Sequence, residues 1–405
     1  MGLGGPPFRG VVLGSLALGA IAVVLVVGAV SSDGADGRPA TFLPPLAPHP
    51  VAGQFEADGT TLGECSEQAC VEQAFGNIAF RRGPKAALAL FARRIAEDDA
   101  GCHRIAHTIG AASLARFRGN VARTFAEGTS SCWSGYYHGV LERSLLGVRS
   151  YTRGSLAKVA RRLCADPTVR EVTWLAYQCL HGLGHGLMLT TGYDLRRSLD
   201  VCRRLPASWD AEACKGGAFM ENISPMYGAT SRWLRNDDPL YPCPAVVEAD
   251  RYECYKRSTT RMLMVIGFDW ERMAELCSSL RADWKEACFV SFGRDTSAQN
   301  ERDADQIIPL CELARRHAAE RVCIQGAAMD ITANDASGAR ATVLCNALEP
   351  RLRGVCYRAI GMIAGRFHRT DEEREADCRA LAATARDLAW CLRGSLRSAE
   401  LVDIA

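Results

Sequence analysis

Apolar residues fill one unbroken run near the start of the chain and recur afterwards at helical spacing. The run from Val11 to Val30 carries no charge, and Ser15 is its only strongly polar member. As a helix rising about 1.5 Å per residue, it matches the roughly 30 Å hydrocarbon core of a bilayer. Arg9 precedes the run and Asp33 follows it, and positive charge favours the cytoplasmic side. We therefore predict a single-pass membrane protein with residues 1–10 in the cytoplasm, a transmembrane anchor in the lipid bilayer over 11–30, and an extracytoplasmic remainder.

A cleavable signal peptide is the alternative for this run. Small residues close to its end could serve as a cleavage site near Ala29, and cleavage there would give a secreted protein. The apolar part of a signal peptide usually spans only roughly 7 to 15 residues, which favours the anchor.

A proline-rich stretch separates the anchor from the rest of the chain. Residues 31–59 contain five prolines. Such a segment cannot bury a core, and its prolines favour extended conformations. We predict a stalk over 31–59.

Beyond the stalk, apolar residues at helical spacing alternate with polar bends, and paired cysteines mark the same period. From Cys202 onward, the first members of successive pairs lie 41, 34, 34, 34 and 33 residues apart. A period near 34 residues indicates an internal repeat, which is typical of a solenoid. The seven pairs are Cys164 with Cys179, Cys202 with Cys214, Cys243 with Cys254, Cys277 with Cys288, Cys311 with Cys323, Cys345 with Cys356, and Cys378 with Cys391.

Each repeat unit has the pattern of two helices. In the unit around Cys277, Asp269 is placed to cap a first helix that carries Met273, and a second helix is expected to begin near Trp284 and to continue past Cys288. No strand-type alternation competes with this pattern. We predict an all-α fold, a solenoid of helical hairpins, with histidine-rich units over 60–190 and cysteine-paired units over 191–405.

The cysteines of a pair lie just before and just after the bend, where two antiparallel helices bring them within disulfide distance. An extracytoplasmic setting favours oxidation, and structural zinc sites use shorter spacings, so we predict disulfides within each hairpin. The four cysteines that remain are expected to pair as Cys65 with Cys70 and Cys102 with Cys132. In period the hairpins resemble tetratricopeptide-like arrays, and their cysteine staples resemble Sel1-like repeats. The tetratricopeptide pattern of Trp, Leu-Gly and Tyr is absent from these units, so the resemblance implies architecture alone.

Small residues recur three positions after the second cysteine of most pairs. A glycine inside a helix is unfavourable by about 1 kcal/mol relative to alanine, so this recurrence indicates close packing of helices. Ile105 and Arg257 break the pattern. Gly184 and Gly186 lie outside this pattern. We consider that they allow a ligand or a neighbouring backbone to approach the helix closely. The small residues are Gly135, Gly182, Gly217, Ser291, Gly326 and Ala359.

The net charge argues against nucleic-acid binding, and the positions of the histidines indicate a candidate site. Lys and Arg number 48 against 46 Asp and Glu, a net charge of +2 that lacks the basic excess of a nucleic-acid-binding protein. Five of the eight histidines lie between residues 103 and 185, each within six residues of a cysteine. Residues spaced i, i+4 share one face of a helix, and the second helices of a solenoid stack side by side. We predict that three adjacent helices bring together three such pairs: His103 with His107, His138 with Glu142, and His181 with His185.

Imidazole and carboxylate ligands suit zinc, copper or iron. The set suffices for one ion with an open position or for two ions that share Glu142. Glu142 is a candidate both for ligand and for general base. Glu221 occupies nearly the position of His138 and His185 in the next unit and is a second candidate for a catalytic base. The leading hypothesis is a metal-binding site that is a candidate for metal-dependent catalysis.

Other interpretations stay open. The histidines could be structural or could act without a metal in acid–base chemistry. The site could also store or deliver metal without catalysis. Alternatively, the chain is an envelope scaffold whose repeat surface binds a protein or peptide. Nucleophile-elbow, Walker, dinucleotide-binding and haem-attachment motifs are missing from the sequence.

Overall fold

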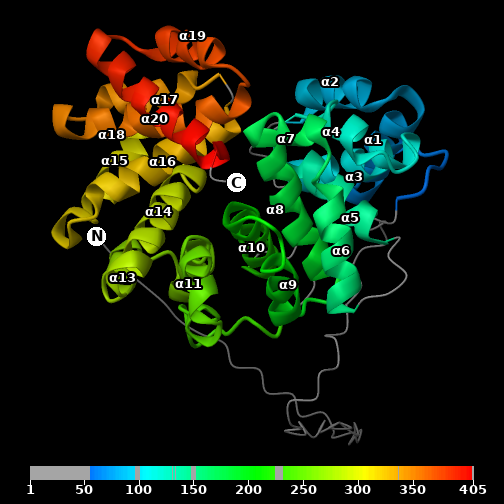
Figure 1. Cartoon of the computed structure of the whole chain (residues 1–405), viewed down its shortest axis with the longest axis horizontal. Helices are drawn as coiled ribbons and strands as arrows, with labels where there is room; N and C mark the ends of the chain where they lie inside the picture. The colour runs from blue at the N-terminus through cyan, green and yellow to red at the C-terminus, as the bar shows by residue number, and fades with distance from the viewer. Residues whose placement is uncertain are drawn as a thin grey trace, which may run out of the picture. The chain divides into compact units, whose positions relative to one another are not determined.

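The fold of the described residues is entirely helical. The computed structural model describes residues 55–95, 101–129, 131–132, 134–146, 152–223, 231–335 and 337–403. Over these ranges it contains twenty α-helices, four short 3-10 helices and no strand (Figure 1). The all-α prediction is confirmed. The predicted anchor over 11–30 lies outside these ranges, and within them we find no helix with the length and apolarity of a membrane span.

One set of helices packs side by side in chain order. Its members are α1 (Gln68–Arg82), α3 (Cys102–Arg116), α5 (Gly135–Leu146), α8 (Thr173–Thr190), α10 (Ser208–Ile223), α11 (Glu248–Tyr255), α14 (Ala282–Ala298), α16 (Glu320–Asn334), α18 (Pro350–Ala364) and α20 (Ala385–Asp403). Apolar side chains form two buried clusters, one reaching from Phe55 to Cys214 and one from Met188 to Ile360.

Shorter helices lie between the members of this set along the chain, and most of them pack against it. Asp269 caps one of them, α13, where its carboxylate accepts a hydrogen bond from the backbone N–H of Arg272 at 2.9 Å. This cap confirms the helix start that the sequence predicts there. The shorter helices are α2 (Pro84–Arg94), α4 (Val121–Phe125), α6 (Arg153–Leu163), α7 (Pro167–Arg170), α9 (Leu195–Cys202), α12 (Thr259–Ile266), α13 (Trp270–Ser278), α15 (Ala304–Glu312), α17 (Ala339–Ala347) and α19 (Asp371–Leu381).

Disulfides join all eighteen cysteines in nine pairs, with Cα–Cα distances from 5.2 to 5.7 Å. Cys65 bonds to Cys70 and Cys102 bonds to Cys132, as expected for the four cysteines outside the repeat pattern. The spacing of the cysteines is therefore sufficient to predict how the chain is cross-linked.

Seven of these disulfides join cysteines that lie 11 to 15 residues apart. Their partners are those that the period of the sequence predicts. Cys164 bonds to Cys179, Cys202 to Cys214, Cys243 to Cys254, Cys277 to Cys288, Cys311 to Cys323, Cys345 to Cys356, and Cys378 to Cys391.

The end of the predicted stalk belongs to the folded unit. Phe55 is only 1% exposed, although the proline-rich pattern assigns it to the stalk. The side chain of Gln73 on α1 donates to the carbonyl of Glu56 at 2.8 Å, and that of Asn77 donates to the carboxylate of Asp58 at 2.7 Å. Two amides on one face of α1 thus bind the segment that precedes the helix. The folded unit therefore begins before residue 59, where the proline content of the sequence ends the predicted stalk.

The unit around Cys243 and Cys254 departs from the regular hairpin. Its second helix is divided into α11 and α12, and Arg257 lies between the two. Two signals in the sequence mark this place: the 41-residue step that precedes the unit, and Arg257 in place of the expected small residue.

Glycines set the distance between the helices that carry the histidines. A Cβ atom on Gly217 of α10 would lie 1.9 Å from the carbonyl oxygen of His181 on α8. Reciprocally, a Cβ on Gly184 would lie 2.1 Å from the carbonyl oxygen of Cys214. Gly184 therefore allows the backbone of α10 to pack closely against α8. The same reciprocal contact joins α3 to α5, α14 to α16 and α18 to α20, through Gly110 and Gly139, Gly293 and Gly326, and Gly361 and Gly394.

We expect a Gly217→Ala variant to be destabilised by about 1 to 3 kcal/mol, because the added methyl group forces α10 away from α8. Gly154 in α6 is the matched control, since a Cβ atom there meets nothing within 4 Å. Gly154→Ala is expected to raise the free energy of unfolding by up to about 1 kcal/mol through helix propensity. Urea unfolding of both variants measures the two effects, and equal effects would contradict the packing explanation.

Candidate metal centre

Three neighbouring helices place five histidines around one point. His103 and His107 lie on α3, His138 lies on α5, and His181 and His185 lie on α8. The ring of His138 is central, with centroid distances to the other four rings of 5.3, 5.4, 5.5 and 4.2 Å. His103 is 9% exposed and the other four are at most 3% exposed. The predicted cluster of imidazoles therefore forms, in the interior of the fold.

Within the cluster the histidines form two close pairs. The Nε2 atoms of His103 and His107 are 3.0 Å apart, and those of His181 and His185 are 3.4 Å apart. Each pair forms a triad with His138, in which one nitrogen from each ring lies within 4.8 Å of the others. Either triad could hold a metal ion, and His138 is the residue that the two triads share.

Buried carboxylates orient one ring of each pair. Glu142 on α5 lies 2.9 Å from Nδ1 of His107, and Glu221 on α10 lies 2.9 Å from Nδ1 of His185. The hydroxyl of Tyr193 donates to the second oxygen of Glu221 at 2.6 Å. Carboxylates that bind Nδ1 fix the tautomer and the orientation of a metal-binding histidine. The sequence indicates both glutamates, and the structure places them behind the imidazoles, on the side away from Nε2.

The remaining ring of each pair has a different partner at Nδ1. Nδ1 of His103 lies 2.6 Å from the carbonyl oxygen of Cys132, and Nδ1 of His181 lies 3.4 Å from the hydroxyl of Tyr177. The four outer rings thus share one arrangement, with Nδ1 held from outside and Nε2 directed to the partner ring. Sequence reasoning missed Tyr177, Tyr193 and the Cys132 carbonyl, because no spacing rule links them to the histidines.

His138 differs from the four outer rings. Both of its ring nitrogens are buried, and neither has a hydrogen-bond partner in the part of the chain that the structure describes. Buried polar atoms are nearly always hydrogen-bonded, and an unsatisfied one is unfavourable by roughly 1 to 3 kcal/mol. The central imidazole therefore has two nitrogen atoms without hydrogen bonds from the described residues, in a place where the surrounding nitrogens could also bind a metal.

Burial lowers the pKa values of four imidazoles, those of His103, His107, His138 and His181, because desolvation disfavours their charged form. The pKa of His107 falls to about 3. The pKa values of His103, His138 and His181 fall well below their ordinary range, through burial first and then through the charges of neighbouring groups, mainly other histidines. Burial and Glu221 raise the pKa of Tyr193, which therefore remains a hydrogen-bond donor. These four imidazoles are neutral at pH 7, and neutral imidazole is the form that binds a metal.

Other polar groups near the cluster serve the packing of the helices. Tyr136 and Tyr137 are buried, and the hydroxyl of Tyr136 donates to the carbonyl of Thr124 at 2.8 Å. The amide of Asn222 donates to the carbonyl of Trp233 at 3.2 Å. These contacts give Tyr136 and Asn222 a role in packing the helices.

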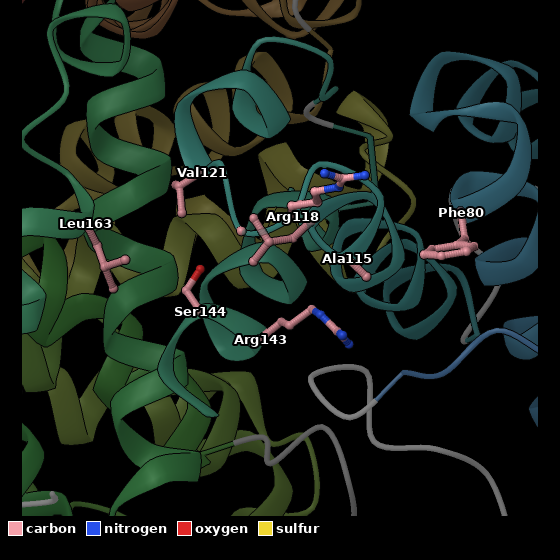
Figure 2. Close-up of a pocket in the computed structure, with 9 residues that line it drawn as sticks. Phe80, Ala115, Arg118, Val121, Arg143, Ser144 and Leu163 are labelled. Carbon is pink, nitrogen blue, oxygen red and sulfur yellow. The ribbon is translucent and has the colours of Figure 1, made fainter. Parts of the chain in front are cut away.

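A cavity of about 480 Å³ lies apart from the cluster. Its lining includes Phe80 of α1, Ser144 and Arg143 of α5 and Leu163 of α6 (Figure 2). Arg143 is held there by donating to the carbonyl of Phe55 at 2.7 Å. No histidine lines this cavity, so it is separate from the candidate metal centre.

No protein family, curated protein or solved structure matches this chain. The function therefore has to be argued from the site itself, since a helical fold alone implies no activity.

Proposed function

We propose that the folded part of the chain is a transition-metal-binding unit whose ligands are His103, His107, His138, His181 and His185. One observation carries the proposal: His138 has two buried ring nitrogens that form no hydrogen bond with any described residue, between two pairs of facing Nε2 atoms. A metal ion beside each nitrogen would satisfy these atoms, with His138 bound to both ions as an imidazolate after its ring proton is released to solvent. All-nitrogen ligation suits zinc, copper or iron, and the cysteines, all in disulfides, supply no thiolate.

The two triads support a centre for two ions that share His138, in place of the sharing through Glu142 considered from the sequence. Glu142 and Glu221 then orient His107 and His185, and neither needs to be a ligand or a base. Three protein ligands leave a position open on each ion. Such an ion supplies Lewis-acid chemistry if it is zinc, and electron or oxygen chemistry if it is copper or iron.

We further propose that this unit is a solenoid of helical hairpins held outside the cytoplasm by the anchor over 11–30. The regular period of the cysteine pairs and the side-by-side packing of the long helices support the solenoid. The nine disulfides support an oxidising compartment. The alternative, a scaffold that binds a protein or peptide, requires no metal and is separated from the main proposal by the following measurement.

The test is metal analysis of the full chain, produced under oxidising conditions and purified in detergent. We expect nearly stoichiometric metal in the parent and none in a variant with alanine at positions 103, 107, 181 and 185. His317→Ala is the control, because this partly exposed histidine lies in the 3-10 helix Arg315–His317, far along the chain from the cluster. Mass spectrometry verifies the disulfides of each variant. No metal in the parent, even after loading with zinc, copper and iron, would overturn the proposal.

A further inference from the structure

Several partly buried arginines in this fold, Arg170 and Arg353 among them, are paired with carboxylates. Arg170 donates to both oxygens of Asp210 at 2.8 and 2.6 Å, and Arg353 donates to both oxygens of Asp387 at 2.8 Å. Arg366 has no hydrogen bond and no ion pair within the described ranges, although it is only partly exposed. Burying an unpaired charge is unfavourable. A bound anion would therefore stabilise the guanidinium of Arg366 in this position.

A second arginine lies close to the first. Arg257, the residue that interrupts the pattern of small side chains between α11 and α12, donates through Nη2 to the hydroxyl of Tyr177 at 3.0 Å. Its Nε is buried and has no hydrogen-bond partner in the described structure. Two carboxylates lie nearby, and each also binds another cation, since Glu253 binds Lys256 at 3.0 Å and Asp295 binds Arg294 at 2.9 Å. Burial lowers the pKa of Arg257, but Tyr177 and these two carboxylates outweigh that effect and raise it.

Tyr177 joins the two arginines. The guanidinium carbon of Arg366 lies 5.9 Å from the centre of the Tyr177 ring, whose hydroxyl binds Arg257. The 3-10 helix η5 (Gly365–Phe367) carries Arg366 and contacts α8, which carries Tyr177. Burial, with the charge of Arg257 contributing, lowers the pKa of Arg366 from its ordinary value. Arg257 and Arg366, which are 109 residues apart in the sequence, thus place two positive charges beside one phenol.

The ring of Tyr177 belongs to a chain of aromatic contacts that includes Trp174 and Phe367. Trp174 and Phe367 have ring centroids 4.5 Å apart, and Trp174 and Tyr177 have centroids 6.1 Å apart. The planar fork of a guanidinium matches the geometry of carboxylate and phosphate groups, and aromatic walls reduce the competition from water. This combination of charge and apolar surface is typical of a site for a small organic anion.

We propose that Arg257 and Arg366 bind the carboxylate or phosphate group of a small anionic ligand, against the rings of Trp174, Tyr177 and Phe367. The site is adjacent to the histidine cluster, because the Tyr177 hydroxyl that binds Arg257 also lies 3.4 Å from Nδ1 of His181. As a substrate site for the metal centre it rests on the proposed function. The binding of the anion itself requires no metal.

The test measures thermal unfolding of the full chain in detergent, with chelator present, while inorganic phosphate or benzoate is added at constant ionic strength. We expect both the parent and Arg379→Gln to be stabilised by at least one of the two anions. Arg379 is the matched control, since it is an exposed arginine on α19. Stabilisation by phosphate alone assigns a phosphate ligand, and stabilisation by benzoate alone assigns an aromatic carboxylate.

The Arg366→Gln variant distinguishes an anion-binding role of Arg366 from a purely structural one. We expect this variant to lose the response to the anions and to unfold at a higher temperature than the parent when no anion is present, because it removes an unpaired charge. A purely structural role for Arg366 predicts a lower unfolding temperature. If Arg366→Gln does not fold, Arg366→Lys keeps the charge without the planar fork, and its affinity is expected to be roughly tenfold weaker.

Two results would overturn the anion site: a parent that responds to neither anion, or an Arg366 variant whose response equals that of the parent. Because chelator is present throughout, failure of the metal centre leaves this experiment unchanged. The two proposals therefore fail independently.

Discussion

A His138→Ala variant is expected to lose metal from both triads at once. Each triad would keep only two of its three imidazoles, because His138 is the residue they share. The loss of one of three ligands weakens binding strongly, and we expect metal content after dialysis to fall to near zero. Elemental analysis of the dialysed protein measures this directly, with His317→Ala as the control for removal of an imidazole elsewhere.

A second variant distinguishes two ions from one. His103→Ala/His107→Ala removes one triad and leaves His138, His181 and His185 in place. With two separate ions, this variant keeps half of the parent's metal, whereas a single ion held by all five rings would be lost. Full retention of metal by His138→Ala would show that His138 is not a shared ligand. It would leave its two unsatisfied nitrogens without an explanation.

Removing a disulfide from the regular hairpins is expected to have the largest effect on stability. The bond between Cys345 and Cys356 closes a hairpin at a sequence separation of 11 residues, and both cysteines are fully buried. A Cys345→Ala/Cys356→Ala variant is expected to lose about 3 kcal/mol of unfolding free energy through loop entropy, plus a contribution from lost packing. Reduction of all nine bonds is expected to abolish cooperative unfolding, as followed by circular dichroism.

The bond between Cys65 and Cys70 is the matched comparison. It closes a shorter loop, with a sequence separation of 5, and both cysteines are partly exposed. The Cys65→Ala/Cys70→Ala variant is expected to lose about 2 kcal/mol or less of unfolding free energy. A disulfide that closes a shorter loop restricts the unfolded chain less, and little packing is lost at these partly exposed cysteines. If both double variants unfold at the same urea concentration, the buried disulfides contribute no more than the exposed one.

The sequence predicts those features of the fold that depend on local periodicity. The 34-residue step of the cysteines and the i, i+4 spacing of the histidines both follow from the geometry of helical hairpins, in which residue spacing fixes the helix face. The cross-linking of each hairpin and the gathering of five imidazoles are consequences of that register. The anchor over 11–30 is likewise an expectation from local pattern, and it remains a prediction.

Tertiary structure decides which groups meet from separate helices. Glu142 and Glu221 are visible as candidates in the sequence, but only the packing of α5 against α3 and of α10 against α8 places them behind His107 and His185. The glycine contacts that set these helix distances involve backbone atoms of the neighbouring helix. Arg366 reaches Tyr177 from a distant part of the chain, and no local spacing encodes that contact. The positions of functional groups on each helix are thus local properties of the sequence, whereas their partners depend on how the helices stack, because stacking sums packing contributions from the whole chain.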